Sequence, residues 1–458
     1  MIRDADGRFS IPRVDARAAH AWASIAWVIL WLFSLQLGPV YTLRLRAAPL
    51  SGDFIDDSSV ALWFVTLTVV GWLLRSVGRS VARPVLPAVG RVHHLFVVWW
   101  CVLALSTVWS VNRARTFVQV VLLAGTAVAA HCAASLVGRE GFLASLWISS
   151  QLGAVIAYRA VTAKWTGSID EYGQWTGIYF NRNSLGPVAA MGMLTTVGLI
   201  GSVYRWSGRR RGTVAVRAVA ITVGTVLFAI DLRLALGARS VTSAAAAVAT
   251  VVMVVAVRAL RRSGGGDRQA LTFWGSVLVF LGGSAAGVVA LRSVAPHILK
   301  KASNFNGRST IWRVVIDGIR VHPVRGWGWM AAWTNAGFMT RVAERVGQPI
   351  DRAHNGLLEV ALGSGLIGTI AFIVLIGGAA GDALADATRV SLLSDLPLAL
   401  IVYAAVMNTM ESFTGANVLP WALVLAAVTM AQGSYGRGVR PLRAARGVRA
   451  ESSTAVER

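Results

Sequence analysis

One polar stretch, residues 293–355, holds the residue types best suited to chemistry in an otherwise apolar sequence. It carries nine Lys or Arg against Asp317, Glu344 and Asp351, and it closes on a histidine, His354. An arginine guanidinium matches phosphate oxygens bidentately and stays charged at physiological pH. A histidine, with an unperturbed pKa of about 6.5, can take or give one proton. Together these groups suit a phosphorylated substrate and a single proton transfer.

Two arginines near the ends of expected helices are candidates for holding phosphate. Arg308 precedes a Ser-Thr pair that can cap a helix. A cation beside a positive helix terminus is unfavourable unless an anion shares the site, and a bound phosphate would relieve the repulsion. Arg239 stands in the turn 237–240, at the outer mouth of two expected spans. It either contacts a phosphate or extends to the lipid head groups, as helix-end arginines do.

The other polar residues on the same side have more than one interpretation. His354 is a candidate base, or it only caps the following helix or is a satisfied interfacial histidine. Segment 163–182 has aromatic residues beside carboxylates, which suit a sugar ring or an interfacial aromatic belt. The remaining candidate substrate contacts are Asn183, Asn355, Arg352, Arg182, Glu411, Trp175 and Asp170.

The composition excludes several classes of protein. Hydrophobic residues make up 55% of the chain and charged residues only 14%, and apolar blocks of helix-spanning length predict a polytopic membrane protein. The formal charge of +23 comes largely from arginines between these blocks, where they set orientation, so we expect no nucleic acid partner. Cys101 and Cys132 lie inside apolar blocks. Because neither a glycine-rich phosphate loop nor metal-ligand spacing occurs, we expect no metal and no cofactor.

We predict an all-α fold of about twelve transmembrane helices, since each crossing needs ~20 apolar residues. The expected spans start near Ala21, Val60, Leu95, Thr116, Gly141, Ser184, Ala218, Ser240, Ala270, Gly356, Leu396 and Val418. Lys and Arg collect in alternate gaps, which predicts that both termini are cytoplasmic and that the stretch 293–355 faces outward from the plasma membrane. The gap 381–395 departs from this pattern, because it has three Asp against one Arg.

The predicted parts are the first nine spans in residues 1–292, an extracytoplasmic loop in 293–355, the last three spans in 356–435 and a basic cytoplasmic tail in 436–458. Within the loop, four apolar residues recur at helical spacing: Trp312, Val315, Ile316 and Ile319. Pro323 ends this expected amphipathic helix. A Gly-Trp-Gly-Trp turn follows, and then a second amphipathic helix that Gly347 stops.

Several blocks of the sequence resemble the O-antigen ligase and polymerase family. They are Arg308-Ser-Thr-Ile-Trp312, Pro323, Gly326-Trp-Gly328, Ala353-His354-Asn355, and Gly363 with Gly365. Their order and spacing match the family, and with the twelve-span layout the resemblance covers most of the chain. Arg308 and His354 correspond by motif. Arg239 corresponds by position, although the family often has Ser-Arg where this chain has Ala-Arg, and Asn183 stands where the family commonly carries an asparagine after an aromatic residue.

The resemblance implies a metal-independent, inverting glycosyltransferase with a membrane-embedded, GT-C-like fold. Such an enzyme moves a glycan from a polyprenyl diphosphate donor to a hydroxyl of a glycan or glycolipid acceptor outside the membrane. It also implies that Arg239 and Arg308 hold the diphosphate and that His354 assists the acceptor. Whether the chain is a ligase or a polymerase stays open, because the acceptor leaves no signature in these residues.

A transporter or flippase of lipid-linked precursors is the competing class. Twelve spans suit both, but transporters place ionisable residues near mid-membrane and often use paired broken helices. Here the charge gathers in one outer loop, which favours an enzyme. A non-catalytic scaffold for envelope assembly would leave the pattern of arginines and histidine unexplained.

Overall fold

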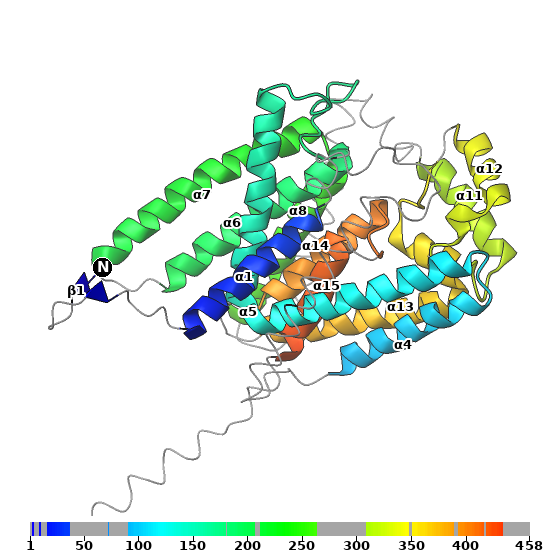
Figure 1. The fold of residues 1–458 in the computed structure, drawn as a ribbon, viewed down its shortest axis with the longest axis horizontal. Coiled ribbons are helices and arrows are strands. Elements are labelled where there is room, and N and C mark those ends of the chain that lie inside the picture. The colour runs from blue at the N-terminus through cyan, green and yellow to red at the C-terminus, as the bar shows by residue number, and fades with distance from the viewer. Residues whose placement is uncertain are drawn as a thin grey trace, which may run out of the picture.

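The structure is a computed structural model that describes residues 2–3, 9–10, 16–36, 72, 90–179, 181–206, 211–262, 308–347, 350–388, 393–415 and 418–433. This part of the chain forms a bundle of α-helices (Figure 1). The helices are α1 (Ala16–Ser34), α4 (Arg91–Leu105), α5 (Arg113–Thr162), α6 (Arg182–Trp206), α7 (Arg211–Ala238), α8 (Val241–Arg262), α11 (Arg308–Val321), α12 (Ala336–Val346), α13 (Gly356–Ala387), α14 (Leu396–Met410) and α15 (Leu419–Gly433). Two 3-10 turns, η1 (Ser106–Val108) and η3 (Ala332–Thr334), and the antiparallel pair β1 (Ile2–Arg3) and β2 (Phe9–Ser10) complete the described elements.

Six of the described helical segments are long and apolar enough to cross a membrane: α4 with η1, α5, α6, α7, α8 and α13. The helix α5 has 50 residues, and a straight helix of that length would extend about 75 Å, more than twice the ~30 Å of a hydrocarbon core. Gly138 breaks it with non-helical angles (φ 64°, ψ −173°). The two halves of α5 coincide with the predicted spans near Thr116 and Gly141, and that each half crosses the membrane stays a prediction.

The prediction of a helical, polytopic membrane protein is confirmed. Shorter apolar helices α1, α14 and α15 coincide with three further predicted spans. The spans predicted near Val60 and Ala270 lie outside the described residues, as do residues 293–307 of the loop and the tail 436–458. The total of twelve spans and the full extent of the loop stay predictions.

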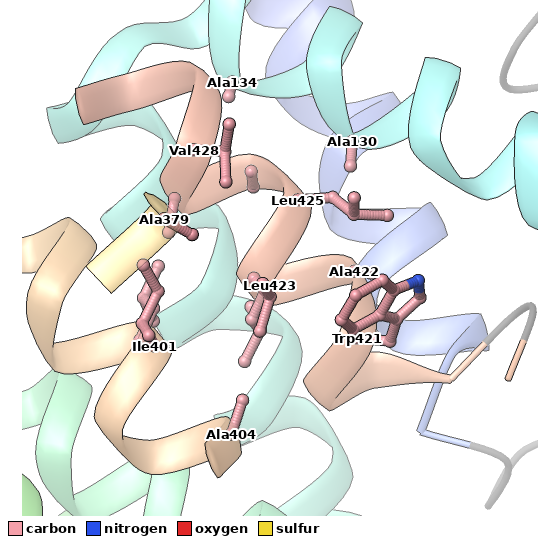
Figure 2. Packing of buried hydrophobic residues seen from close by; sticks show 14 of the residues in the cluster. Ala130, Ala134, Ala379, Ile401, Ala404, Trp421, Ala422, Leu423, Leu425 and Val428 are labelled. Carbon is pink, nitrogen blue, oxygen red and sulfur yellow. The ribbon is translucent and has the colours of Figure 1, made fainter. Parts of the chain in front are cut away.

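The helix α15 lies at the centre of the bundle. Every residue from 419 to 432 is buried, as expected for a helix that is hydrophobic all round. Figure 2 shows Leu425 and Val428 of α15 beside Ala130 and Ala134 of α5, with Ala379 of α13 and residues of α14 also close by. Small residues at these positions let the backbones of α5, α13 and α15 approach closely.

The unusual acidic gap between α13 and α14 has a structural explanation. Asp386, at the end of α13 far from His354, pairs with Arg139 beside the break in α5 (2.5 Å). Asp395, directly before α14, accepts a hydrogen bond from Nε of Arg258 in α8 (2.6 Å). Asp386 and Asp395 therefore neutralise arginines from neighbouring gaps, and Asp382 accepts a hydrogen bond from Gln432 (3.0 Å). Because they have these partners, their presence does not argue against the predicted orientation.

The segment 308–347 forms a small lobe against the start of α13 (Figure 1). Its own core contains Ile311, Val314 and Val315 of α11 with Phe338 and Val342 of α12. The sequence pattern predicted a helix here but placed its apolar face about one residue off, since Ile316 is exposed and Ile311 and Val314 are buried. The helix also begins at Arg308 itself, not after the Ser-Thr pair.

The Gly-Trp-Gly turn docks this lobe onto a kink in α13. The N–H groups of Trp327 and Gly328 donate to the carbonyls of Leu362 (3.0 Å) and Gly363 (2.9 Å). Gly326 (φ 67°) and Gly365 (φ 63°) adopt left-handed backbone angles, and a Cβ on either would collide with backbone of the opposite segment. Only glycine allows two backbones to approach this closely. These contacts attach the lobe to α13, close to the His354 segment.

Candidate active site

His354 has a strained backbone immediately before α13. Its φ is +50°, in the left-handed region, which costs a non-glycine residue about 1–2 kcal/mol. Its two chain neighbours are held by hydrogen bonds: Ala353 N–H donates to Oε2 of Glu359 (2.7 Å), and Asn355 N–H donates to Oγ of Ser412 (3.2 Å). Strain of this kind persists only where surrounding contacts maintain it, and it is frequent at functional sites.

Glu411 joins His354 to Arg308. Its Oε2 lies 2.9 Å from Nδ1 of His354, and its Oε1 accepts from the Arg308 guanidinium. The three residues come from three places in the sequence: the residue that caps the end of α14, the segment before α13, and the first residue of α11. The structure therefore brings together two residues predicted to be catalytic with one that was a minor candidate.

The carboxylate of Glu411 determines which histidine nitrogen can act as a base. An ionised carboxylate only accepts hydrogen bonds, so Nδ1 of His354 carries the proton in this contact. The other nitrogen, Nε2, then keeps its lone pair, which can take a proton. The same arrangement of base and orienting carboxylate occurs in catalytic triads. The side chains of Arg308 and Glu411 are 10% and 8% exposed, whereas that of His354 is 25% exposed, so the histidine is the member that solvent and substrate reach best.

The anion expected beside the α11 N-terminus is present within the protein. Arg308 is the first residue of α11, where its charge opposes the helix dipole. The Glu411 carboxylate compensates that charge. A guanidinium has five N–H donors, so this contact leaves donors for a second anion. Arg308 thus has a role in orienting Glu411 besides any contact with phosphate.

Arg239 lies in a different environment. It also has a φ of +50°, in the turn between α7 and α8, and its N–H donates to the carbonyl of Ala235 (3.1 Å). It is exposed, and among the described residues no carboxylate pairs with its guanidinium. The start of α6 packs against Ser240, the residue after Arg239, since a Cβ on Gly186 would collide with Ser240. Arg182 and Asn183, which begin α6, therefore belong to the same neighbourhood as Arg239.

The remaining candidates on the His354 side are occupied by other contacts. Arg352 makes a two-point ion pair with the adjacent Asp351, at 2.9 and 3.0 Å. Asn355 caps α13 by accepting from Leu358 N–H (3.0 Å), and its amide donates to the Thr409 carbonyl (3.0 Å). Both residues therefore shape the segment that holds His354. A substrate contact from either would have to compete with these bonds.

The aromatic segment 163–181 divides into packed and exposed residues. Trp175 packs on Gly237 and under Arg233, whose guanidinium carbon lies 5.1 Å from the ring centre. The backbone N–H of Trp175 donates to the Gly237 carbonyl (3.1 Å). The Asp170 carboxylate accepts from two backbone N–H groups of its own loop. Trp175 and Asp170 thus stabilise this loop and the turn before Arg239. Tyr172 is exposed, and a hydrogen bond to Glu171 raises the pKa of its hydroxyl.

Sequence reasoning missed Glu359 and underrated Glu411. Glu359 is almost fully buried in the first turn of α13 and accepts from Ala353 and Trp333. A glutamate five residues after His354, at the start of an apolar span, was a readable signal, because acidic residues are rare inside membrane helices. The link from Glu411 to His354 crosses 57 positions, and no local pattern predicts it.

A groove of about 260 Å³ opens beside this cluster, between α13, α14 and α15. Its polar end is formed by Asn355, Asn408 and Thr409, and the rest of its wall is mainly apolar, including Phe372 and Trp421. The groove therefore begins next to His354 and continues along apolar helix surface. Its lining suits a hydrocarbon chain better than a sugar.

Comparison with known proteins agrees with these observations. Residues 176–373 match a family model described as O-antigen ligase. No curated protein matches the chain. The matched segment contains Arg239, Arg308 and His354 and ends before Glu411. The resemblance predicted from the sequence is thereby confirmed over residues 176–373, which are similar to the O-antigen ligase model and include several helices of membrane-spanning length.

Proposed function

We propose that the protein is a metal-independent, inverting glycosyltransferase that moves a glycan from a polyprenyl diphosphate to an acceptor hydroxyl at the outer face of the plasma membrane. The observation that carries this proposal is the contact of His354 with Glu411, which leaves Nε2 of His354 available as a base. The family match supports a membrane ligase in polysaccharide assembly. The donor, acceptor and stereochemistry follow from the resemblance and the arrangement of charges.

In the proposed reaction, Nε2 of His354 accepts the proton of the acceptor hydroxyl as its oxygen attacks the anomeric carbon. The bond from that carbon to the diphosphate oxygen breaks, and the electron pair leaves with the diphosphate. Attack from the opposite face inverts the anomeric configuration. Glu411 stabilises the protonated His354, because the imidazolium then faces a carboxylate.

The two arginines divide the stabilisation of the leaving group unequally in this proposal. Negative charge grows on the departing oxygen, so a fixed cation there binds the transition state more tightly than the ground state. Arg239 is exposed, and no described carboxylate pairs with it, so it is the main diphosphate contact, with Arg182 and Asn183 nearby. Arg308 contributes its remaining donors while it holds Glu411. The groove beside Asn355 offers an apolar site for a lipid chain of donor or acceptor.

Mass spectrometry of lipid-linked glycans in cells that lack the protein tests this function. We expect the polyprenyl diphosphate donor to accumulate with its sugars intact and on the outer leaflet. Purified protein should then transfer the glycan from that donor to an acceptor and release the polyprenyl diphosphate. Accumulation on the inner leaflet would instead favour a flippase.

One observation favours the transporter or flippase alternative. Asp231 is fully buried inside α7, where its Oδ2 accepts from the amide of Gln151 in α5 (2.7 Å) and its Oδ1 has no hydrogen-bond partner among the described residues. Ionisable residues at such depth are frequent in transport pathways. Transport of labelled lipid-linked glycan into proteoliposomes, compared between the native protein and Asp231→Asn, separates the two functions. An enzyme should show transfer that survives Asp231→Asn and no transport.

A further inference from the structure

The carboxylate of Glu359 accepts hydrogen bonds from Trp333, Ala353 and the Ser412 hydroxyl in a buried site. Its Oε1 accepts from Nε1 of Trp333 (2.5 Å) and its Oε2 from the N–H of Ala353 (2.7 Å). The residue is 3% exposed, and in the described part of the chain no salt bridge includes it. Burial of a charge without an ion pair is unfavourable unless hydrogen bonds compensate it. The hydrogen-bond donors around Glu359 therefore compensate the burial of its carboxylate.

Two of these donors, Trp333 and Ala353, belong to different parts of the site. Ala353 directly precedes His354, whose backbone is strained, and Trp333 lies in η3, between the Gly-Trp-Gly turn and α12. Glu359 itself belongs to α13. One carboxylate therefore fixes the His354 segment and the lobe to the same helix. After His354 in the chain, the Asn355 N–H donates to Ser412. Nδ1 of the His354 ring contacts Glu411.

Only a carboxylate satisfies both donors at once. It presents two acceptor oxygens, whereas a glutamine presents one acceptor oxygen and one NH₂ donor. With glutamine at this position, either Ala353 N–H or Trp333 Nε1 would face another donor. Glutamine has nearly the same shape, so the chemical demand comes from the pair of donors and not from packing.

We infer that Glu359 is a positioning residue for His354: it holds the backbone before the histidine so that Nδ1 stays on Glu411 and Nε2 faces the acceptor. This inference rests on the proposed function. A misplacement of a catalytic group by about 1 Å can lower the rate about 100-fold. Glu359 acts through His354 and does not itself touch the substrate.

The first test compares Glu359→Gln with the native protein in two measurements. We expect kcat for glycan transfer to fall about 10- to 100-fold with KM nearly unchanged. We also expect diethyl pyrocarbonate to modify His354 several-fold faster, as measured by peptide mass spectrometry, because its ring is no longer held on Glu411. His322, which contacts Trp327, serves as the internal reference for the modification rate.

The second test is a rescue. Trp333→Phe removes the indole donor, so in the double variant Glu359→Gln/Trp333→Phe the glutamine oxygen can turn to Ala353 N–H and its NH₂ to the vacated side. We expect Trp333→Phe alone to stay within about threefold of native turnover and the double variant to recover most of the loss. A merely structural role predicts the opposite, with the double variant worse than either single one.

Two results would overturn the inference: native turnover and a native modification rate in Glu359→Gln, or a Trp333→Phe variant as damaged as Glu359→Gln. Failure of the proposed function has a different signature. In that case no variant, nor the native protein, transfers glycan, while the modification rate of His354 still responds to Glu359→Gln. The chemical modification therefore tests the positioning role without depending on activity.

Discussion

The segments around His354 and Arg239 share an unusual backbone and differ in almost everything else. Both residues have a φ of +50° in the left-handed region. His354 is held by Glu411, and its neighbours by Glu359 and Ser412. Arg239 is exposed, and none of the described carboxylates pairs with it. A base must be oriented before the substrate arrives, whereas a cation for a diphosphate is best left unneutralised until the anion binds.

The charges follow the same division. Arg308 and Glu411 cancel each other next to His354, so that region attracts anions only weakly. Arg239 and Arg182 have no such compensation in the described part of the chain. The resemblance treated Arg239 and Arg308 as equal partners on the diphosphate. In the structure Arg308 has an internal partner, Glu411, and Arg239 is exposed, and the contact of either with a diphosphate stays a prediction.

The prediction with the largest consequence is the side of the membrane on which the His354 and Arg239 regions lie. From the arginine bias of alternate gaps we expect both regions outside the membrane. Reporter fusions at Gln348 and at Gly264, two positions outside the described residues, should report exterior and cytoplasm respectively. A cytoplasmic signal from Gln348 would place the His354 region on the wrong side and remove every site assignment together.

His354→Ala should lower turnover about 10²- to 10⁴-fold, the usual range for loss of general acid or base assistance. Donor binding and folding should remain. The control is His322→Ala, since His322 lies in the same lobe and contacts Trp327 without joining Glu411. Equal losses in the two variants would show that His354 has no special role. Because a diphosphate is already a good leaving group, a loss near the lower limit would mean that His354 mainly orients the acceptor.

The two arginines should separate in stability. Arg308→Ala leaves the buried carboxylate of Glu411 without its cation, and loss of one partner of a buried pair costs about 3–5 kcal/mol. Arg239→Ala removes an exposed side chain, and we expect a change within about 0.5 kcal/mol. Thermal unfolding of the purified variants in detergent measures both. Equal unfolding temperatures for the two variants would contradict the distinction between an internal and an external arginine.

The same residues should separate less sharply in turnover. Lysine keeps the charge but loses the bidentate fork, so Arg239→Lys and Arg308→Lys should be partly active and both alanine variants nearly inactive. The double alanine variant should lose less than the sum of the single losses, because both arginines act on one reaction centre. If Arg239→Ala turns over normally, Arg239 only extends to lipid head groups, and Arg182 becomes the next candidate for the diphosphate.

The smallest expected change in stability comes from the exposed ion pairs of Asp317 on α11, in contrast to the buried pair of Arg308 and Glu411. Asp317 on α11 is exposed and pairs with Arg345 of α12 (2.7 Å) and with Arg320 (3.1 Å), and the hydrogen bond from Arg345 lowers its pKa. Its folded pKa lies below the unfolded value, so its contribution to stability is present above the unfolded pKa. That contribution is lost as the pH falls through the folded pKa. Asp317→Asn should therefore narrow the difference in unfolding temperature between pH 7 and pH 3 only slightly. A shift as large as that of Arg308→Ala would contradict the weak value of exposed pairs.

The sequence predicted the helical bundle well because membrane spans depend on a simple local property. About 20 apolar residues are needed at each crossing, and this pattern located even the break inside α5, near Gly138. The lobe was predicted less well. Its helices were found, but the apolar face of α11 was misplaced, because Phe338 and Leu362 from distant parts of the chain decide which side is buried.

The site was predictable in its residue types and not in its connections. Arg308 and His354 were readable from local motifs, and Glu411 from its place at the end of a span. That Glu411 would contact both of them depends on how α14 packs against α13, which no spacing encodes. The backbone strain at His354 and Arg239 was equally unreadable, since neither residue is a glycine.

The position of α15 has a consequence for the order in which the protein is made. It is the last described helix to leave the ribosome, yet it is buried on all sides between α5, α13 and α14. The packing between α5, α13 and α14 is therefore complete only once α15 has joined them. A nascent chain halted before Leu419 would contain His354, Glu411 and Arg308 but would lack the groove wall that Pro420, Trp421 and Val424 form.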